Sequence, residues 1–140
     1  MRRTATADIT GPTGTSEVLL TGLSFPVISG RRYKFRAVVD VAQGANTYGA
    51  VLMAGTGVST SRMVGKSQMQ NTAATADAIS HFTAVASGTA PASVGAANYL
   101  GSIEGILTAS ADGTFTVSAK LSAAGTFTAK AGSFIEYQEL

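Results

Sequence analysis

The sequence predicts an all-β fold, a jelly-roll β-sandwich of about eight strands, on two observations. Glycine and proline recur at short intervals along its 140 residues, and between them lie runs of about 5–10 residues rich in Val, Ile, Phe, Tyr and Thr. Several runs alternate apolar and polar residues, as half-buried strands do. The chain is long enough for one domain with a real core. An immunoglobulin-like sandwich is the alternative with the same signals.

Residues 32–41 form the clearest predicted strand. Tyr33 and Phe35 fall on one face of it, followed by Ala37, Val39 and Val41, while Arg32, Lys34 and Arg36 fall on the other. Because side chains alternate across a strand, the aromatic face is expected to enter the core. The three basic residues are then expected to face solvent or a neighbouring protein, as a basic contact face.

The remaining strands are predicted from similar runs bounded by turn residues. The tetrapeptide Gly-Thr-Phe-Thr occurs at 113–116 and 125–128, and each copy is interpreted as a strand start with a core anchor, Phe115 or Phe127. Glycines at 101 and 105 indicate bulges or close backbone approach. The expected strands are 17–25 (ending at Pro26), 47–54, 62–69, 79–86, 99–109, 114–121, 126–130 and 133–140. A helical turn is expected at 73–78 and a long surface loop at 87–98.

The first 15 residues are predicted to act as an N-terminal arm, with the β-sandwich domain spanning residues 16–140. They are polar, broken by glycine and proline, and carry Arg2 and Arg3. A free tail of this composition would be disordered. We therefore expect it to order against a neighbouring protein subunit, with both arginines as contacts to acidic groups there.

The composition favours contact with other proteins over several other functions. Charged residues make up only 13% of the chain, so a surface rich in Gly, Ala, Ser and Thr loses little solvation on contact, although small residues also simply fill turns. The net charge is +2, without the concentrated basic patch of a nucleic-acid-binding protein. No apolar run is long enough to span a membrane, and the N-terminus does not read as a signal peptide. The chain has no cysteine, which excludes disulfides and metal sites with thiolate ligands.

The residues give little support for catalysis, and no catalytic, cofactor or metal site is predicted. His81 is the single histidine, on a predicted strand where Ser80 and Phe82 face the opposite side. Glu104 and Glu136 lie on predicted strands and form the one conceivable carboxylate pair of a glycosidase, but both are more simply outward strand residues. The chain is therefore expected not to be an enzyme.

Three segments carry a resemblance to a known family. They are LSFPVISGRRYKFRAVVDV (residues 23–41), IEGILTASADGTFTVSAKL (103–121) and AGSFIEYQEL (131–140). Together they resemble the small jelly-roll virion proteins of tailed bacteriophages, in capsid decoration proteins and fibre- or tail-associated domains. The resemblance implies a β-sandwich that is commonly a homotrimer, without catalytic residues to assign.

The expected function follows from that resemblance. It is a capsid decoration protein that binds the outside of a phage head as a homotrimer and stabilises it, with the major capsid protein or another virion protein as partner. The N-terminal arm, with Arg2 and Arg3, is then expected to contact the capsid or a neighbouring subunit. The expected location is the virion, after synthesis in the host cytoplasm. A receptor- or carbohydrate-binding module of a fibre or tail is the alternative, and a small glycan-active enzyme is a weaker one.

Overall fold

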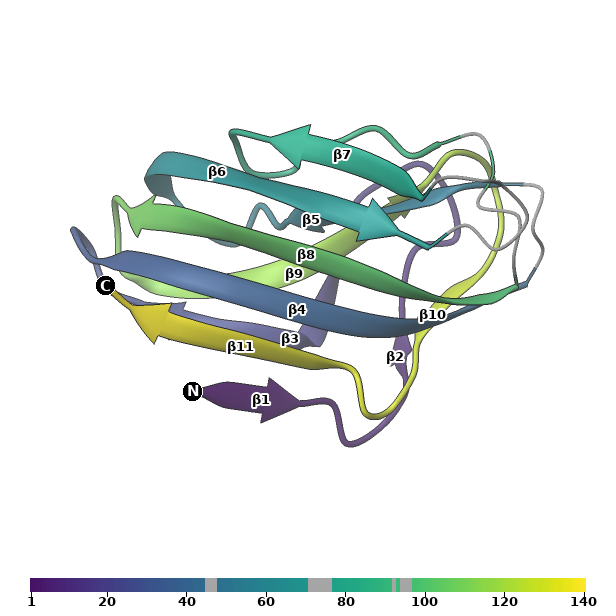
Figure 1. Ribbon diagram of the computed structural model, residues 1–140, viewed down its shortest axis with the longest axis horizontal. Coiled ribbons are helices and arrows are strands. Elements are labelled where there is room, and N and C mark those ends of the chain that lie inside the picture. Colours follow the sequence, from purple (N-terminus) through teal and green to yellow (C-terminus); the bar gives the residue numbers. More distant parts are fainter. Residues whose placement is uncertain (45–47, 71–76, 92, 94–96) are drawn as a thin grey trace.

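The computed structural model describes residues 1–44, 48–70, 77–91, 93 and 97–140, which form eleven β-strands and no helix (Figure 1). No helix in these ranges is therefore long and apolar enough to cross a membrane. The strands are β1 (Arg2–Thr4), β2 (Ile9–Thr10), β3 (Val18–Val27), β4 (Arg32–Gln43), β5 (Ala50–Ala54), β6 (Thr60–Met69), β7 (Ala78–Phe82), β8 (Asn98–Ala109), β9 (Gly113–Leu121), β10 (Phe127–Ala129) and β11 (Phe134–Glu139).

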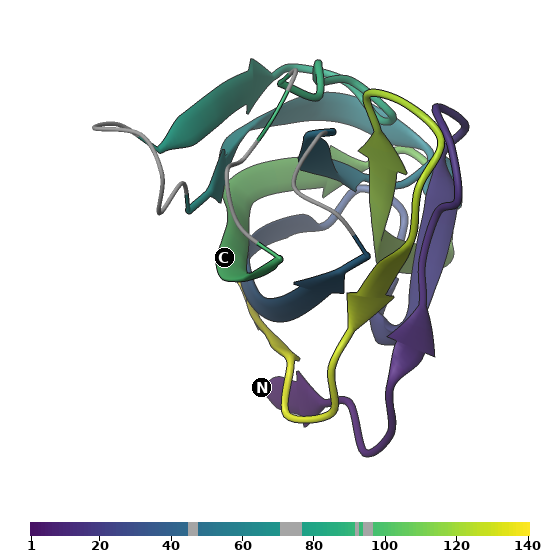
Figure 2. The ribbon, with the colours of Figure 1, turned by 90° about the vertical axis from the view of Figure 1, so that its right-hand side faces the viewer.

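The strands form two antiparallel sheets that pack face to face as a jelly-roll β-sandwich, which confirms the predicted fold class. The large sheet has the order β1-β11-β4-β8-β6-β7, with β10 and β2 continuing it beside β4. The small sheet has the order β3-β9-β5 and lies behind the large one in Figure 1. Figure 2 shows the same sandwich from its end, with the core enclosed between the layers.

Strand β4 confirms the predicted alternation residue by residue. Tyr33 and Phe35 are buried, with 3% and 1% of their surface exposed, and Ala37, Val39 and Val41 are fully buried. Arg32, Lys34 and Arg36 are exposed on the opposite face. The hydrophobic pattern thus fixes which side of the large sheet faces the core.

The core is centred on aromatic rings from both sheets. The ring of Phe115 lies 5.0 Å from that of Phe25 and 4.4 Å from that of Phe35, and Tyr137 stacks on Phe25 at 4.3 Å. Phe115 and Phe127 are both fully buried, as predicted for the two repeated tetrapeptides. Offset and tilted rings at these separations attract one another in addition to burying apolar surface.

Gly101 and Gly105 of β8, predicted to mark either bulges or close backbone approach, are positions where neighbouring atoms approach the backbone closely. A Cβ atom on Gly101 would lie 2.7 Å from the sulfur of Met69, and one on Gly105 would lie 2.6 Å from the backbone oxygen of Val64. Both distances are shorter than a real side chain tolerates. The register of β8 with β4 and β6 continues through both positions.

Some predicted boundaries are wrong, for identifiable reasons. Strand β3 continues through Pro26 to Val27, because β3 is an edge strand and a proline there withholds no ladder hydrogen bond. Strand β7 ends at Phe82 instead of residue 86, because the chain then leaves the sheet and Ala86 adopts a positive φ of 52°. Strand β5 starts at residue 50, and most of the predicted helical turn at 73–78 lies outside the described residues.

The N-terminal segment lies along its own domain. Strand β1 pairs with β11, and β2 pairs with β10. The amide of Gly11 donates to the carbonyl of Phe127 over 2.9 Å, and Asp8 forms an ion pair with Lys130. Residues 1–15 are thus an edge of the sandwich in this structure, and their contact with a neighbouring subunit stays a prediction.

Candidate binding face

The outer face of the large sheet brings together most of the residues that the sequence singled out for chemistry. Cross-strand register aligns one residue from each of six strands in a single row perpendicular to the strands. We call this the charge row. In sheet order it contains Arg2, Glu136, Arg36, Glu104, Lys66 and His81.

From Arg2 to Lys66, opposite charges alternate along the charge row, so each carboxylate lies between two cationic residues. Arg2 contacts Glu136 at 3.8 Å, and Lys66 contacts Glu104 at 3.3 Å. These four side chains are about half exposed, so each pair adds little stability by itself. The pairs order the side chains and neutralise this part of the face.

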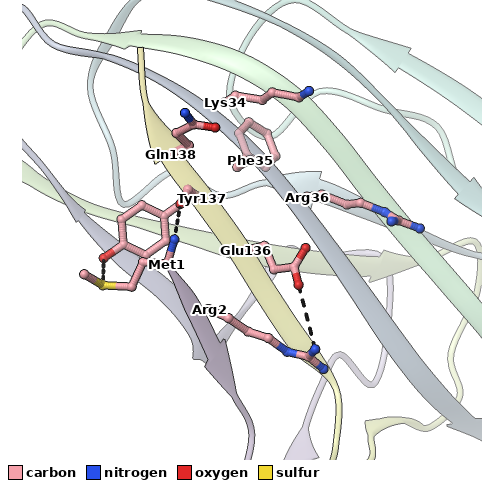
Figure 3. Close-up of a pocket in the computed structure, with 8 residues that line it drawn as sticks. All are labelled: Met1, Arg2, Lys34, Phe35, Arg36, Glu136, Tyr137 and Gln138. Atoms are coloured by element: carbon pink, nitrogen blue, oxygen red, sulfur yellow. Dashed lines mark hydrogen bonds and ion pairs between the residues drawn. The ribbon is translucent and has the colours of Figure 1, made fainter.

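A shallow groove lies where the charge row reaches the sheet edge (Figure 3). It has a volume of about 600 Å³ and runs beside β11, between β1 and β4. The guanidinium of Arg2 lies 3.7 Å from the ring of Phe134, and the hydroxyl of Tyr137 donates to the sulfur of Met1. The backbone oxygen of Tyr137 also accepts from the Met1 amino group. These contacts occupy Phe134 and Tyr137, which are both half-buried.

The predicted basic contact face is part of a wider cationic surface. Arg32, Lys34 and Arg36 are exposed along β4, and register places Arg62 and Lys66 of β6 two strands away. The sequence analysis missed Arg62 and Lys66, because their proximity depends on β8 lying between β4 and β6. The pairing of β8 with β4 and β6 joins segments that are far apart in the chain, and no local sequence pattern predicts it.

The geometry does not assemble the catalytic arrangements considered from the sequence. Glu104 and Glu136 lie two strands apart, roughly 10 Å at normal strand spacing, with the cationic Arg36 between them. His81 is exposed on β7 beside Lys66, while Phe82 is buried as the alternation requires. Within the described residues, no three His, Asp or Glu side chains cluster closely enough to hold a metal ion.

Two other polar groups have perturbed titration for structural reasons. Hydrogen bonds from Lys130 and from the amide of Ala131 hold the pKa of Asp8 below its ordinary value of 3.8. Burial raises the pKa of Tyr99, whose hydroxyl donates to Gln43 over 2.7 Å. The contacts of Asp8 hold residues 5–10 against the turn before β11. The hydrogen bond from Tyr99 to Gln43 joins the start of β8 to the C-terminal end of β4. Neither group borders the outer face of the large sheet near the charge row.

The aromatic side chains are not placed where they could stack on a flat ligand. The chain has six Phe, four Tyr and no Trp, and all ten rings lie in the described residues. Eight are buried, and the other two, Phe134 and Tyr137, are half-buried and in contact with Arg2 and Phe25 respectively. The outer face therefore presents charge and aliphatic surface instead of open rings.

Comparison with known proteins finds solved structures of similar architecture but assigns the chain to no family. No protein-family model matches the chain, and no curated protein matches its sequence. A carbohydrate-binding module (CBM6cm-2) of Cellvibrio mixtus lichenase 5A, solved with cellotriose, aligns over 100% of this chain and 97% of that one, at 11% identity and a TM-score of 0.38.

Two further solved structures align more weakly. The CBM22-1–GH10 modules of Clostridium thermocellum xylanase 10B align with 96% of this chain and 28% of that one, at 9% identity and a TM-score of 0.33. The VP2 subviral particle of infectious bursal disease virus aligns with 100% and 41%, at 7% identity and a TM-score of 0.28. These likenesses concern the β-sandwich architecture alone.

Proposed function

We propose that this chain is a non-enzymatic structural protein of a bacteriophage particle, which binds the outside of the capsid and stabilises it. The observation that carries the proposal is the outer face of the large sheet. It is a broad surface of six strands, lined by charged and aliphatic side chains, and it has no exposed aromatic ring among the described residues. Such a surface suits contact with another protein. The resemblance to small jelly-roll virion proteins supports the same assignment.

The mechanism of stabilisation is the contact area that must be broken before the shell opens. A protein seated across the boundary between capsid subunits adds contacts to both of them. We propose that the chain does this as a homotrimer, because three linked contacts bind far more tightly than one. A receptor- or carbohydrate-binding module would instead need a stacking platform, and the buried or occupied rings do not supply one.

The test of the proposed function is to locate the chain on particles. Particles purified from cultures that express it are analysed by mass spectrometry and by cryo-electron microscopy. We expect the chain at high copy number, with its density on the outside of the head. Density confined to tail fibres would support the alternative of a receptor-binding module, and absence from purified particles would refute a virion role.

The oligomeric state gives a separate prediction. We expect light scattering coupled to size exclusion to return three times the monomer mass of 14.1 kDa at micromolar concentration. The physical reason is the low charge of the chain, which makes burial of its surface against identical copies cheap. A stable monomer under these conditions would contradict the homotrimer, while leaving attachment of single copies to a particle open to the imaging test.

A further inference from the structure

Nine residues on the outer face form a compact grid at one end of the large sheet. They come in threes from β4, β8 and β6, aligned by cross-strand register, and lie towards the left end of the front sheet in Figure 1. We call this grid the corner patch. Its three rows contain Arg32, Thr108 and Arg62; Lys34, Ile106 and Val64; and Arg36, Glu104 and Lys66.

The four corners of the patch are all cationic. They are Arg32, Arg62, Arg36 and Lys66, and Lys34 adds a fifth positive charge at one side. A single carboxylate, Glu104, belongs to the patch, and it forms its ion pair with Lys66. The patch therefore carries a surplus of positive charge that exceeds the +2 of the whole chain.

Most of that charge has no internal partner. In the part of the chain that the structure describes, four ion pairs form, and none of them includes Arg32, Lys34, Arg36 or Arg62. Side-chain hydrogen bonds from these four residues are also absent there. Alternate residues of one strand lie about 6.8 Å apart and neighbouring strands about 4.8 Å apart, so the cations surround an area the size of a few side chains.

The centre of the patch is apolar. Ile106 lies in the middle of the grid and is half-buried, and its cross-strand neighbour Val64 is 47% exposed. Interfaces between proteins combine an apolar centre with a charged rim in this way, because the centre gains from desolvation while the rim selects the partner by charge.

We propose that the corner patch binds an acidic protein segment that places an aliphatic side chain on Ile106 and Val64 and carboxylates beside the surrounding cations. This rests on the proposed function, in which the outer face binds a protein surface, and it names the end of the face and the chemistry of the partner. Outside the corner patch the charge row is already neutralised by the Arg2–Glu136 pair, and inside it Glu104 offsets only Lys66.

The patch fits an acidic protein better than a nucleic acid. Single strands bind by stacking bases on aromatic side chains, and the two aromatic residues of β4, Tyr33 and Phe35, lie on its buried face. Phosphates alone would also leave the apolar pair Ile106 and Val64 exposed. An aliphatic side chain flanked by carboxylates satisfies both parts of the patch.

The experiment is an NMR titration of the full chain with the peptide Glu-Glu-Leu-Glu-Glu, blocked at both ends. Amide shifts are expected in residues 32–36, 62–66 and 104–108. The variant Arg32→Glu/Arg62→Glu should bind at least about tenfold more weakly, because attraction at two corners becomes repulsion. Both side chains are exposed and without partners, so the variant should keep its fold, which amide dispersion reports directly.

Matched controls separate charge, apolar contact and position. The variant Ser16→Glu/Thr21→Glu/Lys120→Glu changes net charge equally, on and beside the small sheet, and should bind as the original chain does. The peptides Gln-Gln-Leu-Gln-Gln and Glu-Glu-Gly-Glu-Glu should each bind more weakly. Equal weakening in both charge variants, shifts outside the patch, or no shifts would overturn the proposal.

A thymidine hexanucleotide is the competing probe. Tighter binding of it than of the acidic peptide, at the same amides, would overturn the proposal in favour of nucleic acid. The titration uses no particles, so its outcome is independent of the search for the chain on purified particles. Peptide binding by a chain that is absent from particles would refute the virion role and leave the corner patch as an acidic-segment site.

Discussion

Replacing Phe115 with alanine is expected to lower the free energy of unfolding by about 3–5 kcal/mol. The side chain is fully buried, and its ring packs against those of Phe25 and Phe35, so its removal leaves a cavity in the core. Because Phe115 comes from β9 and Phe35 from β4, the lost contact with Phe35 joins the small sheet to the large one. Chemical denaturation monitored by circular dichroism measures the change.

Phe134→Ala is the matched control for that substitution. Phe134 is half-buried on the outer face, where its ring contacts Arg2, and its loss leaves no cavity in the core. We expect a cost of about 1 kcal/mol or less, as for surface contacts. Equal costs for the two substitutions would mean that Phe115 is not in the core and that the strand phase is reversed, since a one-residue slip exchanges the two faces.

The sequence predicted the parts of the fold that depend on local alternation. Strand β4 carries five buried apolar residues on one face and three basic residues on the other, and this alternation survives in the structure because one face packs on the core and the other meets solvent. The turns before β4 and before β11 could also be predicted: Gly30 and Gly132 both have positive φ, at 76° and 96°, which glycine adopts without strain.

The predicted surface loop at 87–98 shows where local pattern was insufficient. Val51 and Met53 point away from the core cluster and yet are buried. The described part of the connection after β7 covers them: the amide of Ala86 donates to Ala54, and Gly88 lies against Val51 and Met53. Nothing in the composition of residues 83–91 indicates that they cover β5, because that contact is set by tertiary packing.

The candidate site was predictable only in pieces. Arg32, Lys34 and Arg36 could be assigned to one exposed face, because they lie on one strand. The charge row and the corner patch require the order β11-β4-β8-β6, in which neighbours in space are far apart in sequence. Such an order depends on long-range pairing, which periodicity within a segment does not report.

Gly65→Ala is expected to be the most disruptive small substitution on β6. A Cβ atom there would lie 2.3 Å from the backbone oxygen of Glu104 and 2.4 Å from the ring of Phe82, both well inside contact distance. Gly65 pairs with Gly105 across the two strands, and the missing side chain of Gly65 leaves the space that the ring of Phe82 fills beneath the corner patch. A backbone oxygen in a paired strand cannot move away without breaking its register.

We therefore expect Gly65→Ala to lower the free energy of unfolding by about 1–3 kcal/mol, the range for overpacking a core. The matched control is Gly14→Ala, because a Cβ atom at Gly14 would meet nothing within 4 Å and should change stability by less than about 0.5 kcal/mol. Denaturant midpoints of both variants measure the difference.

Since Gly65 lies between Val64 and Lys66, the first variant should also shift the amides of the corner patch, whereas the second should not. Equal stability of the two variants would show that β6 and β8 are not held as closely as the packing of Phe82 requires.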